Sequence, residues 1–272
     1  MKLTFDDKMM VAGHRGDLYN WPENTMESYR AAIEAGADMV EIDVHVTKDW
    51  QLVLMHDDKV DRTADGSGLI REKTLEQMRA LNVGERTIPM QVPTLEELLQ
   101  LLAENNILLN LEIKEYYRED NVERCHFCIE ECVKLIEKYN YADKMVFNSF
   151  DAHALEYIDE KYPGKYLLHG FYPYSEMRNV SRNPDEYLYC ACVFDCRNGA
   201  HYAHLKEHGI EPWIGAGVTV TETLRECYEL GAKLVTTNFP GNCIRKLEKI
   251  GAKQGAEKQK DSTETQYGQK RD

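Results

Sequence analysis

The sequence predicts an α/β protein, a TIM (β/α)8 barrel with a small insertion after the second strand. Short apolar runs of strand length alternate with helical stretches along most of the chain, which is typical of a parallel sheet. Eight such strands within 272 residues favour a closed barrel, whose functional side chains gather at the carboxyl ends of the strands. An open doubly wound sheet is the alternative.

Each expected strand is a short apolar run. In chain order the runs cover residues 9–14, 38–44, 107–114, 144–149, 165–171, 188–194, 210–215 and 233–237. The expected helices cover residues 24–35, 94–104, 122–138, 151–161, 199–208, 221–230 and 241–249. Asn24 and Glu27 fit an N-cap and its N3 partner, and Gly36, Gly209 and Gly231 lie where helices should end.

Two regions lie outside this alternation. Residues 57–92 are too long for a tight connection, and we expect them to form a small insertion that acts as a lid over the mouth of the barrel. Residues 252–272 are polar with almost no apolar content, which predicts a disordered tail. We therefore expect a single barrel domain over residues 1–251, followed by the tail.

The composition favours a cytoplasmic protein without nucleic-acid partners. The formal charge is −14 and the isoelectric point is near 5.2, whereas a nucleic-acid-binding surface needs clustered Lys and Arg residues. The first residues lack the apolar region of a secretory signal, and no later run is long enough for an integral membrane segment. Eight cysteines in a chain of this size fit reduced thiols. The oligomeric state stays open.

Charged and imidazole side chains lie at the ends of three apolar runs near the N-terminus. They belong to His14, Arg15, Glu41, Asp43 and His56. Because the carboxyl ends of barrel strands face a common mouth, we expect these groups to meet there. They combine groups that bind phosphate, bind metal and transfer protons.

The strand that carries Glu41 and the strand that leads to His56 should form a hairpin. Only residues 47–50 separate the two strands, and a parallel crossover needs a dozen or more residues, so the strands are antiparallel neighbours. If Val46 pairs with Gln51, His56 lies opposite Glu41. The period of two also gives one shared face to Glu41, Asp43 and His45.

A later strand adds a second charged pair. The period of two places Asn110, Glu112 and Lys114 on one face of that strand. A carboxylate and an ammonium group on a barrel strand are costly to bury unless they are paired or bind a ligand. A functional role is therefore favoured over a simple ion pair.

These residues belong to an ordered series of short motifs between residues 14 and 151. The series consists of His14-Arg15-Gly16, Pro22-Glu23-Asn24-Thr25, Gly36-Ala37-Asp38, Glu41-Ile42-Asp43-Val44, Thr47-Lys48-Asp49, His56-Asp57, Asp61-Arg62-Thr63, Leu111-Glu112-Ile113-Lys114 and Asn148-Ser149-Phe150-Asp151. In order and spacing it resembles the glycerophosphodiester phosphodiesterase family. Such a set is far more specific than any one short pattern.

The resemblance implies a TIM barrel that hydrolyses glycerophosphodiesters, the deacylated phospholipid headgroups, to glycerol 3-phosphate and an alcohol. The expected partner is this small-molecule substrate, and the expected cofactor is one divalent cation. The resemblance assigns the metal to Glu41, Asp43 and Glu112, acid–base catalysis to His14 and His56, and phosphate binding to Arg15 and Lys114. Hard carboxylate oxygens suit Mg²⁺ or Ca²⁺.

Three positions depart from the family pattern. The family usually carries a Trp-Thr-Val-Asn run in its seventh strand, where this chain has residues 212–217. Trp213 is a candidate substrate wall at this position, and alignment backward from Leu224 places Ala216 there instead. Asn238 stands where the family has an aspartate, and Trp50 takes a hairpin position where the family commonly has glycine. These changes bear on substrate choice more than on chemistry.

Two other functions remain as alternatives. A lysophospholipase D- or C-type activity on lysolipids needs apolar residues at the rim, for which Trp50, Leu69, Ile70 and Met90 are candidates. A barrel that binds phosphorylated ligands without catalysis is the other alternative, but the retention of all seven expected site residues argues against it. A zinc site is not expected, because the histidines between 201 and 208 fall along one stripe of a helix and the cysteines lack paired Cys-x2-Cys motifs.

Overall fold

The protein is a closed barrel of eight parallel strands, as the sequence predicts. The computed structural model describes residue 3 and residues 8–253. The barrel strands are β1 (Met10–His14), β2 (Met39–Val46), β4 (Leu108–Ile113), β5 (Met145–Asn148), β6 (Leu167–Tyr172), β7 (Cys190–Val193), β8 (Glu211–Ile214) and β9 (Leu234–Thr237). Each strand pairs with the next in this order, and β1 closes the barrel by pairing with both β2 and β9.

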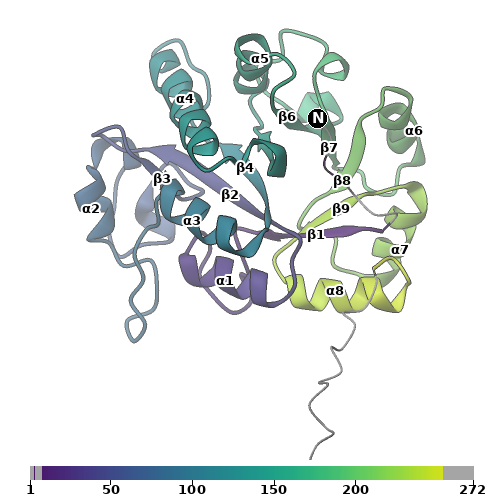
Figure 1. The fold of residues 1–272 in the computed structure, drawn as a ribbon, viewed down its shortest axis with the longest axis horizontal. Coiled ribbons are helices and arrows are strands. Elements are labelled where there is room, and N and C mark those ends of the chain that lie inside the picture. The colour runs from purple at the N-terminus through teal and green to yellow at the C-terminus, as the bar shows by residue number, and fades with distance from the viewer. Residues whose placement is uncertain (1–2, 4–7, 254–272) are drawn as a thin grey trace, which may run out of the picture.

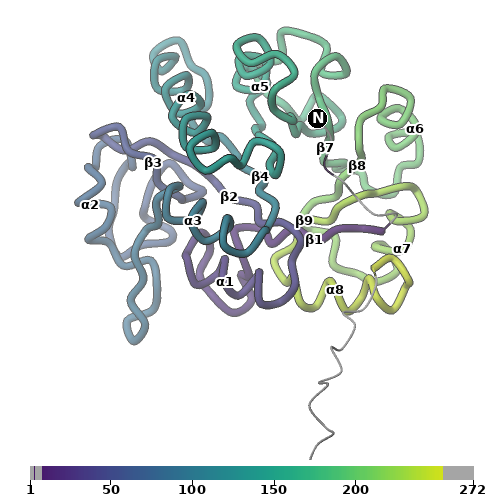
Figure 2. The backbone as a smooth tube through the Cα atoms, viewed as in Figure 1, coloured from purple at the N-terminus to yellow at the C-terminus, as the bar shows by residue number. Residues whose placement is uncertain are grey.

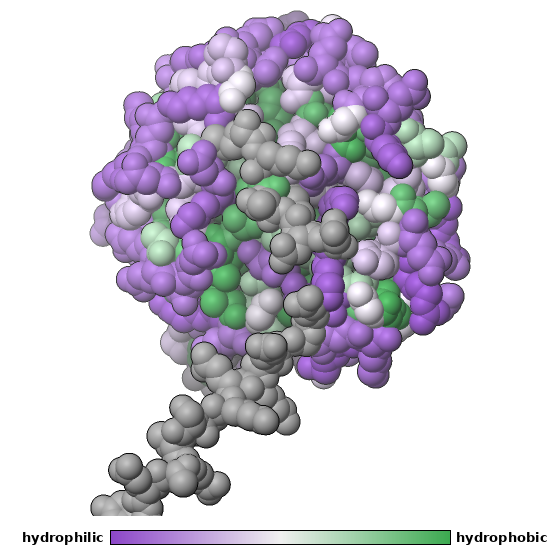
Figure 3. All heavy atoms as spheres, turned by 45° about the vertical axis from the view of Figure 1, so that its right-hand side comes forward, coloured by the Kyte–Doolittle hydropathy of each residue, from purple (hydrophilic) through white to green (hydrophobic). Residues whose placement is uncertain are grey.

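Helices surround this barrel on the outside (Figure 1). They are α1 (Met26–Glu34), α3 (Leu95–Asn105), α4 (Val122–Lys138), α5 (Ala152–Lys161), α6 (Gly199–Glu207), α7 (Thr221–Leu230) and α8 (Pro240–Lys249). Their apolar faces and the outer faces of the strands form the larger hydrophobic core. On the face in Figure 3, hydrophilic residues make up most of the outer rim.

The β2–β3 hairpin has a register one residue away from the expected one. Val46 pairs with Leu52, the first residue of β3 (Leu52–Leu54), and not with Gln51. The reason is the turn: the Thr47 N–H donates to the Gln51 carbonyl at 2.9 Å, and the Thr47 hydroxyl accepts from the Gln51 N–H at 2.9 Å. The turn therefore takes in Thr47 and Gln51, and Trp50 completes it at a φ of 61°.

This shift moves the end of the hairpin. The Met55 N–H donates to the Asp43 carbonyl at 3.1 Å, so Met55 lies beside Asp43 and the expectation that His56 is directly opposite Glu41 is wrong. The face expected for Glu41, Asp43 and His45 is confirmed, because all three are buried and interact on the inner side of the sheet. His56 still borders the same pocket as Glu41.

The segment 57–92 forms its own small unit beside β3. It contains η1 (Val60–Arg62), η2 (Ile70–Glu72) and α2 (Leu75–Arg79), and it packs around a separate apolar core. Figure 2 shows this segment at one side of the barrel, next to β3. Its residues Leu69, Ile70 and Arg71 line a pocket next to the catalytic candidates, so the segment supplies a side wall. Its action as a lid stays a prediction.

The N-terminal cap of α1 differs from the expected one. Thr25, not Asn24, is the N-cap, and it forms a capping box with Ser28 instead of Glu27. Asn24 has a φ of 53°, and its side chain is used elsewhere: its amide donates to Asp43 at 2.9 Å and its carbonyl oxygen accepts from the Tyr29 hydroxyl at 2.7 Å. The residue next along the chain therefore caps the helix.

The described chain continues past the expected end of the domain at residue 251. Ala252 is buried, its carbonyl accepts from the Met9 N–H at 2.8 Å, and Lys253 pairs with Asp38 at 2.5 Å. The rest of the expected tail, residues 254–272, lies outside the described residues. Within the described part of the chain, none of the helices has both the length and the apolar character that crossing a bilayer demands. The cytoplasmic location stays a prediction.

A second, smaller core lies inside the barrel, and a buried histidine packs against it. Trp213 packs there with apolar residues of the other strands. The His169 ring lies 4.7 Å from the Trp213 ring, and its Nδ1 is 3.3 Å from the Asn110 Oδ1. Burial lowers the pKa of His169 to about 3. This histidine is therefore neutral in the folded protein at every pH near neutrality.

We predict that His169→Gln makes the stability less sensitive to acid. Between its ordinary value of 6.5 and its folded value of about 3, His169 takes up a proton only in the unfolded chain. The unfolded state then binds more protons, so His169 lowers the free energy of unfolding as the pH falls, by at most about 1.4 kcal/mol per pH unit. Urea unfolding of both proteins at pH 7 and pH 5 measures this, and equal losses in the two would contradict it.

Candidate active site

Three buried carboxylates meet at the carboxyl end of β2 and β4. They belong to Glu41, Asp43 and Glu112, and one oxygen of each lies within 4.8 Å of the others. The parallel register explains the meeting, because Asp43 pairs directly with Glu112 and Glu41 lies two residues before Asp43 on the same face. The structure thus brings together the three residues to which the resemblance assigns the metal, and their role as metal ligands stays a prediction.

Like charges this close change the proton affinities of the carboxyl groups. Burial and then the neighbouring Asp43 carboxylate raise the pKa of Glu41. Burial also raises the pKa of Glu112, although Lys114 opposes the shift. Asp43 shows the opposite result: burial favours the neutral form, but Lys114 and Arg15 together outweigh it and lower the pKa of Asp43. Asp43 is therefore the stable anion of the cluster. The nearby cations do not fully offset the burial and the repulsion that act on Glu41 and Glu112.

Two cations sit against this cluster. The Lys114 ammonium lies 2.9 Å from Glu112 and 3.6 Å from Asp43. Burial would lower the pKa of Lys114, but the charges of Glu112 and Asp43 raise it above its usual range. The Arg15 Nε lies 3.3 Å from Asp43, and the Arg15 backbone N–H donates to Glu41 at 3.0 Å. Both cations predicted from the sequence are thus in the site.

The turn after β1 is built to place Arg15. Arg15 has a φ of 54° and Gly16 a φ of 97°, so two successive residues take the left-handed region. A Cβ on Gly16 would lie 2.3 Å from the Ser28 hydroxyl, and one on Gly13 would lie 2.8 Å from the Gly16 carbonyl oxygen. Only glycine fits at both positions. The resulting tight turn aims both the backbone N–H and the side chain of Arg15 at the carboxylates.

The two predicted catalytic histidines border the same pocket, and each has a different partner. The His14 Nδ1 lies 2.6 Å from the Asn238 Oδ1, and the His14 Nε2 lies 3.9 Å from Glu41. Burial and then Arg15 lower the pKa of His14. The His56 Nδ1 lies 2.6 Å from Asp57. In both rings the Nδ1 is taken by this partner, so the Nε2 is the nitrogen that can interact with a molecule in the pocket.

A charged network that the sequence analysis missed holds these groups in place. Arg62 binds both Glu23 and Asp57 through its guanidinium, and Glu23 also accepts from Arg15 at 3.0 Å. Hydrogen bonds from Arg62 and His56 keep the pKa of Asp57 far below its usual range, although partial burial opposes them. The signal was present in the motifs that contain Glu23 and Arg62, but neither residue had been given a role.

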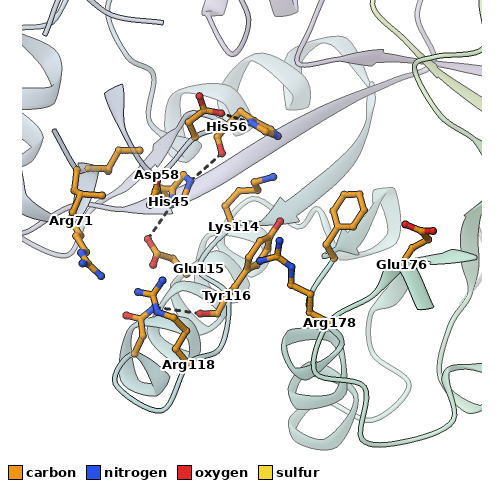
Figure 4. Close-up of a pocket in the computed structure, with 15 residues that line it drawn as sticks. His45, His56, Asp58, Arg71, Lys114, Glu115, Tyr116, Arg118, Glu176 and Arg178 are labelled. Carbon is orange, nitrogen blue, oxygen red and sulfur yellow. Dashed lines mark hydrogen bonds and ion pairs between the residues drawn. The ribbon is translucent and has the colours of Figure 1, made fainter. Parts of the chain in front are cut away.

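Two pockets flank the carboxylate cluster, and His56 and Phe150 line both. One, of about 600 Å³, lies over the barrel axis and has a largely apolar wall: Phe150, Phe171, Val193, Phe194 and Val218. The other, of about 590 Å³, is charged and lies between the insertion and the loops after β4 and β6. In Figure 4, Arg71, Arg118 and Arg178 reach this second pocket from three different segments.

The tryptophans at which the sequence departs from the family pattern can now be located in the structure. Trp213 is only 1% exposed in the lower barrel, so residues 215–218 and not Trp213 supply the pocket wall at this strand. Trp50 lies outside both pockets, where its ring packs 4.7 Å from Phe127 and under the Arg124 guanidinium. Of the apolar rim candidates, Met90 is buried in the insertion core.

The carboxylate cluster fits a divalent cation. The Asp43 Oδ1 is buried and makes no hydrogen bond to any described residue, and one Asp43 oxygen lies within 4.8 Å of an oxygen of Glu41 and of Glu112. Oxygen donors of this kind are the usual ligands of hard divalent cations. A bound cation would also remove the mutual repulsion that raises the pKa of Glu41.

Comparison with known proteins agrees with this geometry. The model of the glycerophosphoryl diester phosphodiesterase family matches residues 14–208. A glycerophosphodiester phosphodiesterase of Caldanaerobacter subterraneus is 36% identical over 161 residues, which cover 57% of this chain and 64% of that protein. A second one, from Bacillus altitudinis, is 31% identical over 260 residues, which cover 88% of this chain and 98% of that protein.

Solved structures share the fold. A phosphodiesterase from Oleispira antarctica, in complex with the product sn-glycerol-3-phosphate, has a TM-score of 0.75 and 23% identity, and the match covers 89% of this chain and 97% of that one. A glycerophosphodiester phosphodiesterase from Parabacteroides distasonis has a TM-score of 0.71 and 21% identity, with 90% and 99% covered. From the family match and the nearly full-length Bacillus relative, the chain belongs to the glycerophosphoryl diester phosphodiesterase family.

Proposed function

We propose that this protein hydrolyses glycerophosphodiesters to glycerol 3-phosphate and an alcohol, with a divalent cation, Mg²⁺ or Ca²⁺, held by Glu41, Asp43 and Glu112. The observation that carries the proposal is the buried carboxylate cluster with Arg15 and Lys114 against it, at the mouth of a barrel. The names of the relatives and the product found in the Oleispira structure support the same reaction.

The cluster has the charge balance for a phosphodiester. A cation bound there would supply Lewis-acid stabilisation of the negative charge that develops on phosphate. Arg15 is fixed by its turn and by Glu23, so its guanidinium is preorganised for a phosphate oxygen. Lys114 adds a point charge beside Glu112. We assign phosphate binding to Arg15 and Lys114 for this reason.

His14 and His56 are suited to the two proton transfers. Hydrolysis requires one group to activate the nucleophile and another to protonate the leaving alkoxide. The Nδ1 of each ring is held by a neighbouring oxygen, at 2.6 Å in both cases, which fixes the ring and directs the Nε2 toward the pocket. We therefore assign acid–base catalysis to this pair.

A lysolipid is the second substrate class that the structure favours. The pocket over the barrel axis has an apolar side that includes Phe150, Phe171 and the half-exposed Phe194. The Phe150 and Phe171 rings stack at 3.6 Å, which gives a continuous apolar surface next to the cluster. Such a surface would contact an acyl chain, whereas a deacylated diester does not need it.

The first test is the reaction itself. Purified protein is incubated with glycerophosphocholine, glycerophosphoethanolamine or lysophosphatidylcholine, in Mg²⁺, Ca²⁺ or EDTA, and glycerol 3-phosphate and free choline are assayed. We expect release of glycerol 3-phosphate from the glycerophosphodiesters with Mg²⁺ or Ca²⁺ and none with EDTA. Failure to hydrolyse any of the three with either cation would reject the enzyme, and choline release from the lysolipid alone would select the second substrate class.

A second prediction concerns the carboxylates. We expect Glu112→Gln or Glu41→Gln to reduce kcat/KM by at least about 100-fold, because an amide lacks the charge that holds the cation and the cation supplies several kcal/mol to the transition state. The exposed Glu104→Gln is the matched control and should keep full activity. Steady-state kinetics over a range of Mg²⁺ concentrations measure the effect. Full activity of Glu112→Gln at low Mg²⁺ would remove Glu112 from the metal site.

A third prediction separates the histidines. His14→Asn and His56→Asn should each lower kcat by roughly 10²- to 10⁴-fold on glycerophosphocholine, as expected for loss of a general acid or base. On a glycerophosphodiester with a nitrophenyl leaving group, which departs without protonation, the variant that lacks the acid should regain most of its activity. The variant that lacks the base should not. Near wild-type rates for both variants on glycerophosphocholine would contradict the assignment.

A further inference from the structure

We propose a second metal site in this protein, formed by Asp185, His204 and His208 and suited to Zn²⁺ or a similar transition metal. The three residues lie on η5 (Pro184–Glu186) and at the C-terminal end of α6, on the outer side of the barrel. The lysophospholipid or glycerophosphodiester chemistry of the mouth does not involve them, because none of the three lines either pocket. The proposal therefore stands apart from the proposed function.

The donor atoms already have metal-like spacing. The His204 Nε2 lies 3.0 Å from one Asp185 oxygen, and the His208 Nε2 lies 3.7 Å from the other. One donor atom of each of the three residues lies within 4.8 Å of the other two. Two ligands at Zn²⁺ distances in a tetrahedral site lie roughly 3.3 Å apart. A small rearrangement of side chains, without movement of the backbone, would thus bring all three to one ion.

The surrounding groups orient these donors. The His208 Nδ1 donates to the His204 carbonyl at 2.9 Å, which leaves the His208 Nε2 with its lone pair free for a metal. The His204 ring stacks on Tyr172, with centroids 4.9 Å apart, so its plane is fixed. The Tyr174 hydroxyl donates to Asp185. Hydrogen bonds of this kind to the outer atoms of ligands are typical of metal sites in proteins.

The charge and the exposure also suit a bound cation. Asp185 is an acidic side chain whose two oxygens lie beside the imidazoles of His204 and His208. The side chains of His204 and His208 are 31% and 37% exposed, which gives an ion access from solvent and leaves room for a water ligand. Two imidazoles and one carboxylate are a ligand set that zinc commonly takes in proteins.

The two sites differ in the metals they prefer. The candidate metal ligands at the mouth are three carboxylates, which suit Mg²⁺ or Ca²⁺, whereas imidazole nitrogens favour Zn²⁺, Ni²⁺ and Cu²⁺. The outer site also has a structural consequence. It joins α6 to the segment after β6, which contains η4 (Tyr174–Glu176) and carries Arg178. Arg178 and Glu176 line the charged pocket, so a bound metal would brace one wall of that pocket.

Histidine NMR tests this site directly. Metal-free protein labelled with ¹⁵N is titrated with ZnCl₂, and the imidazole nitrogens are followed in ¹H–¹⁵N spectra, with assignments from single His→Gln variants. We expect Zn²⁺ to shift the Nε2 signals of His204 and His208, to leave His201 on the same helix unshifted, and Mg²⁺ to shift neither ligand. Unchanged His204 and His208 signals at saturating Zn²⁺ would overturn the proposal.

Calorimetry counts the sites. We expect wild-type protein to bind one more Zn²⁺ per chain than His204→Gln, His208→Gln or Asp185→Asn, and His201→Gln to match the wild type. Glu112→Gln should lose the mouth site and keep the outer one. Saturating Zn²⁺ should also raise the Tm of the wild type by about 5 °C or more above its effect on His204→Gln. Equal Zn²⁺ stoichiometry in the wild type and in all three ligand variants would show that the cluster is only an ion pair.

The ligand variants need a check for folding. His204→Gln could lose zinc binding because α6 is disturbed, so its Tm without metal is compared with that of His201→Gln. Asp185→Asn keeps the size of the side chain and its hydrogen bond to Tyr174, and it provides the second measurement. Loss of the extra Zn²⁺ in Asp185→Asn, with an unchanged metal-free Tm, supports the site. Retention of the extra Zn²⁺ in both variants rejects it.

Discussion

Three carboxylates buried within 4.8 Å of one another are the constraint on which this structure depends. Such a cluster is unstable alone, because burial and mutual repulsion both disfavour the charged forms. The neighbouring elements stabilise the cluster by placing two cations beside it. The turn after β1 takes left-handed backbone to bring Arg15 to Asp43, and β4 continues past Glu112 to bring Lys114 to the same carboxylates.

The length of β2 follows from the same requirement. Its first half pairs with β1 inside the barrel, and its second half extends beyond β1 and pairs with β3 instead. Two side chains hold the extension in place: Glu115, after β4, accepts from the Val46 N–H at 2.9 Å, and Arg124, on α4, donates to the Val46 carbonyl at 2.8 Å. Trp50 packs against that Arg124. These contacts hold the projecting hairpin in place, and the chain that leaves β3 then places His56 at the mouth of the barrel.

The sequence predicts the barrel and its charged cluster because both depend on period and order along the chain. The period of two places Glu41 and Asp43 on one face of β2, and Glu112 on one face of β4 with Asn110, and the direct pairing of Asp43 with Glu112 joins the two faces. The alternation of strands and helices needs no long-range information. Details set by competition between neighbours were not predictable. Thr25 replaces Asn24 as the cap because Asp43 takes the Asn24 amide, and Thr47 shifts the hairpin by closing the turn with its hydroxyl. The proposed site of Asp185, His204 and His208 was not expected, because Asp185 lies on a different segment from the two histidines and only the fold brings it to them.

The two catalytic candidates have unequal environments, and the inequality comes from their partners. His14 faces the amide of Asn238, so the acceptor on its Nδ1 is neutral, and burial and Arg15 lower its pKa. His56 faces the Asp57 carboxylate, which the Arg62 guanidinium keeps ionised. Pairs of titratable groups in environments that differ in this way are how one site separates an acid from a base. In this chain burial and Arg15 lower the pKa of His14, and Asn238, which stands where the family pattern has an aspartate, supplies a neutral partner instead of a charged one. The carboxylate cluster itself is unaffected.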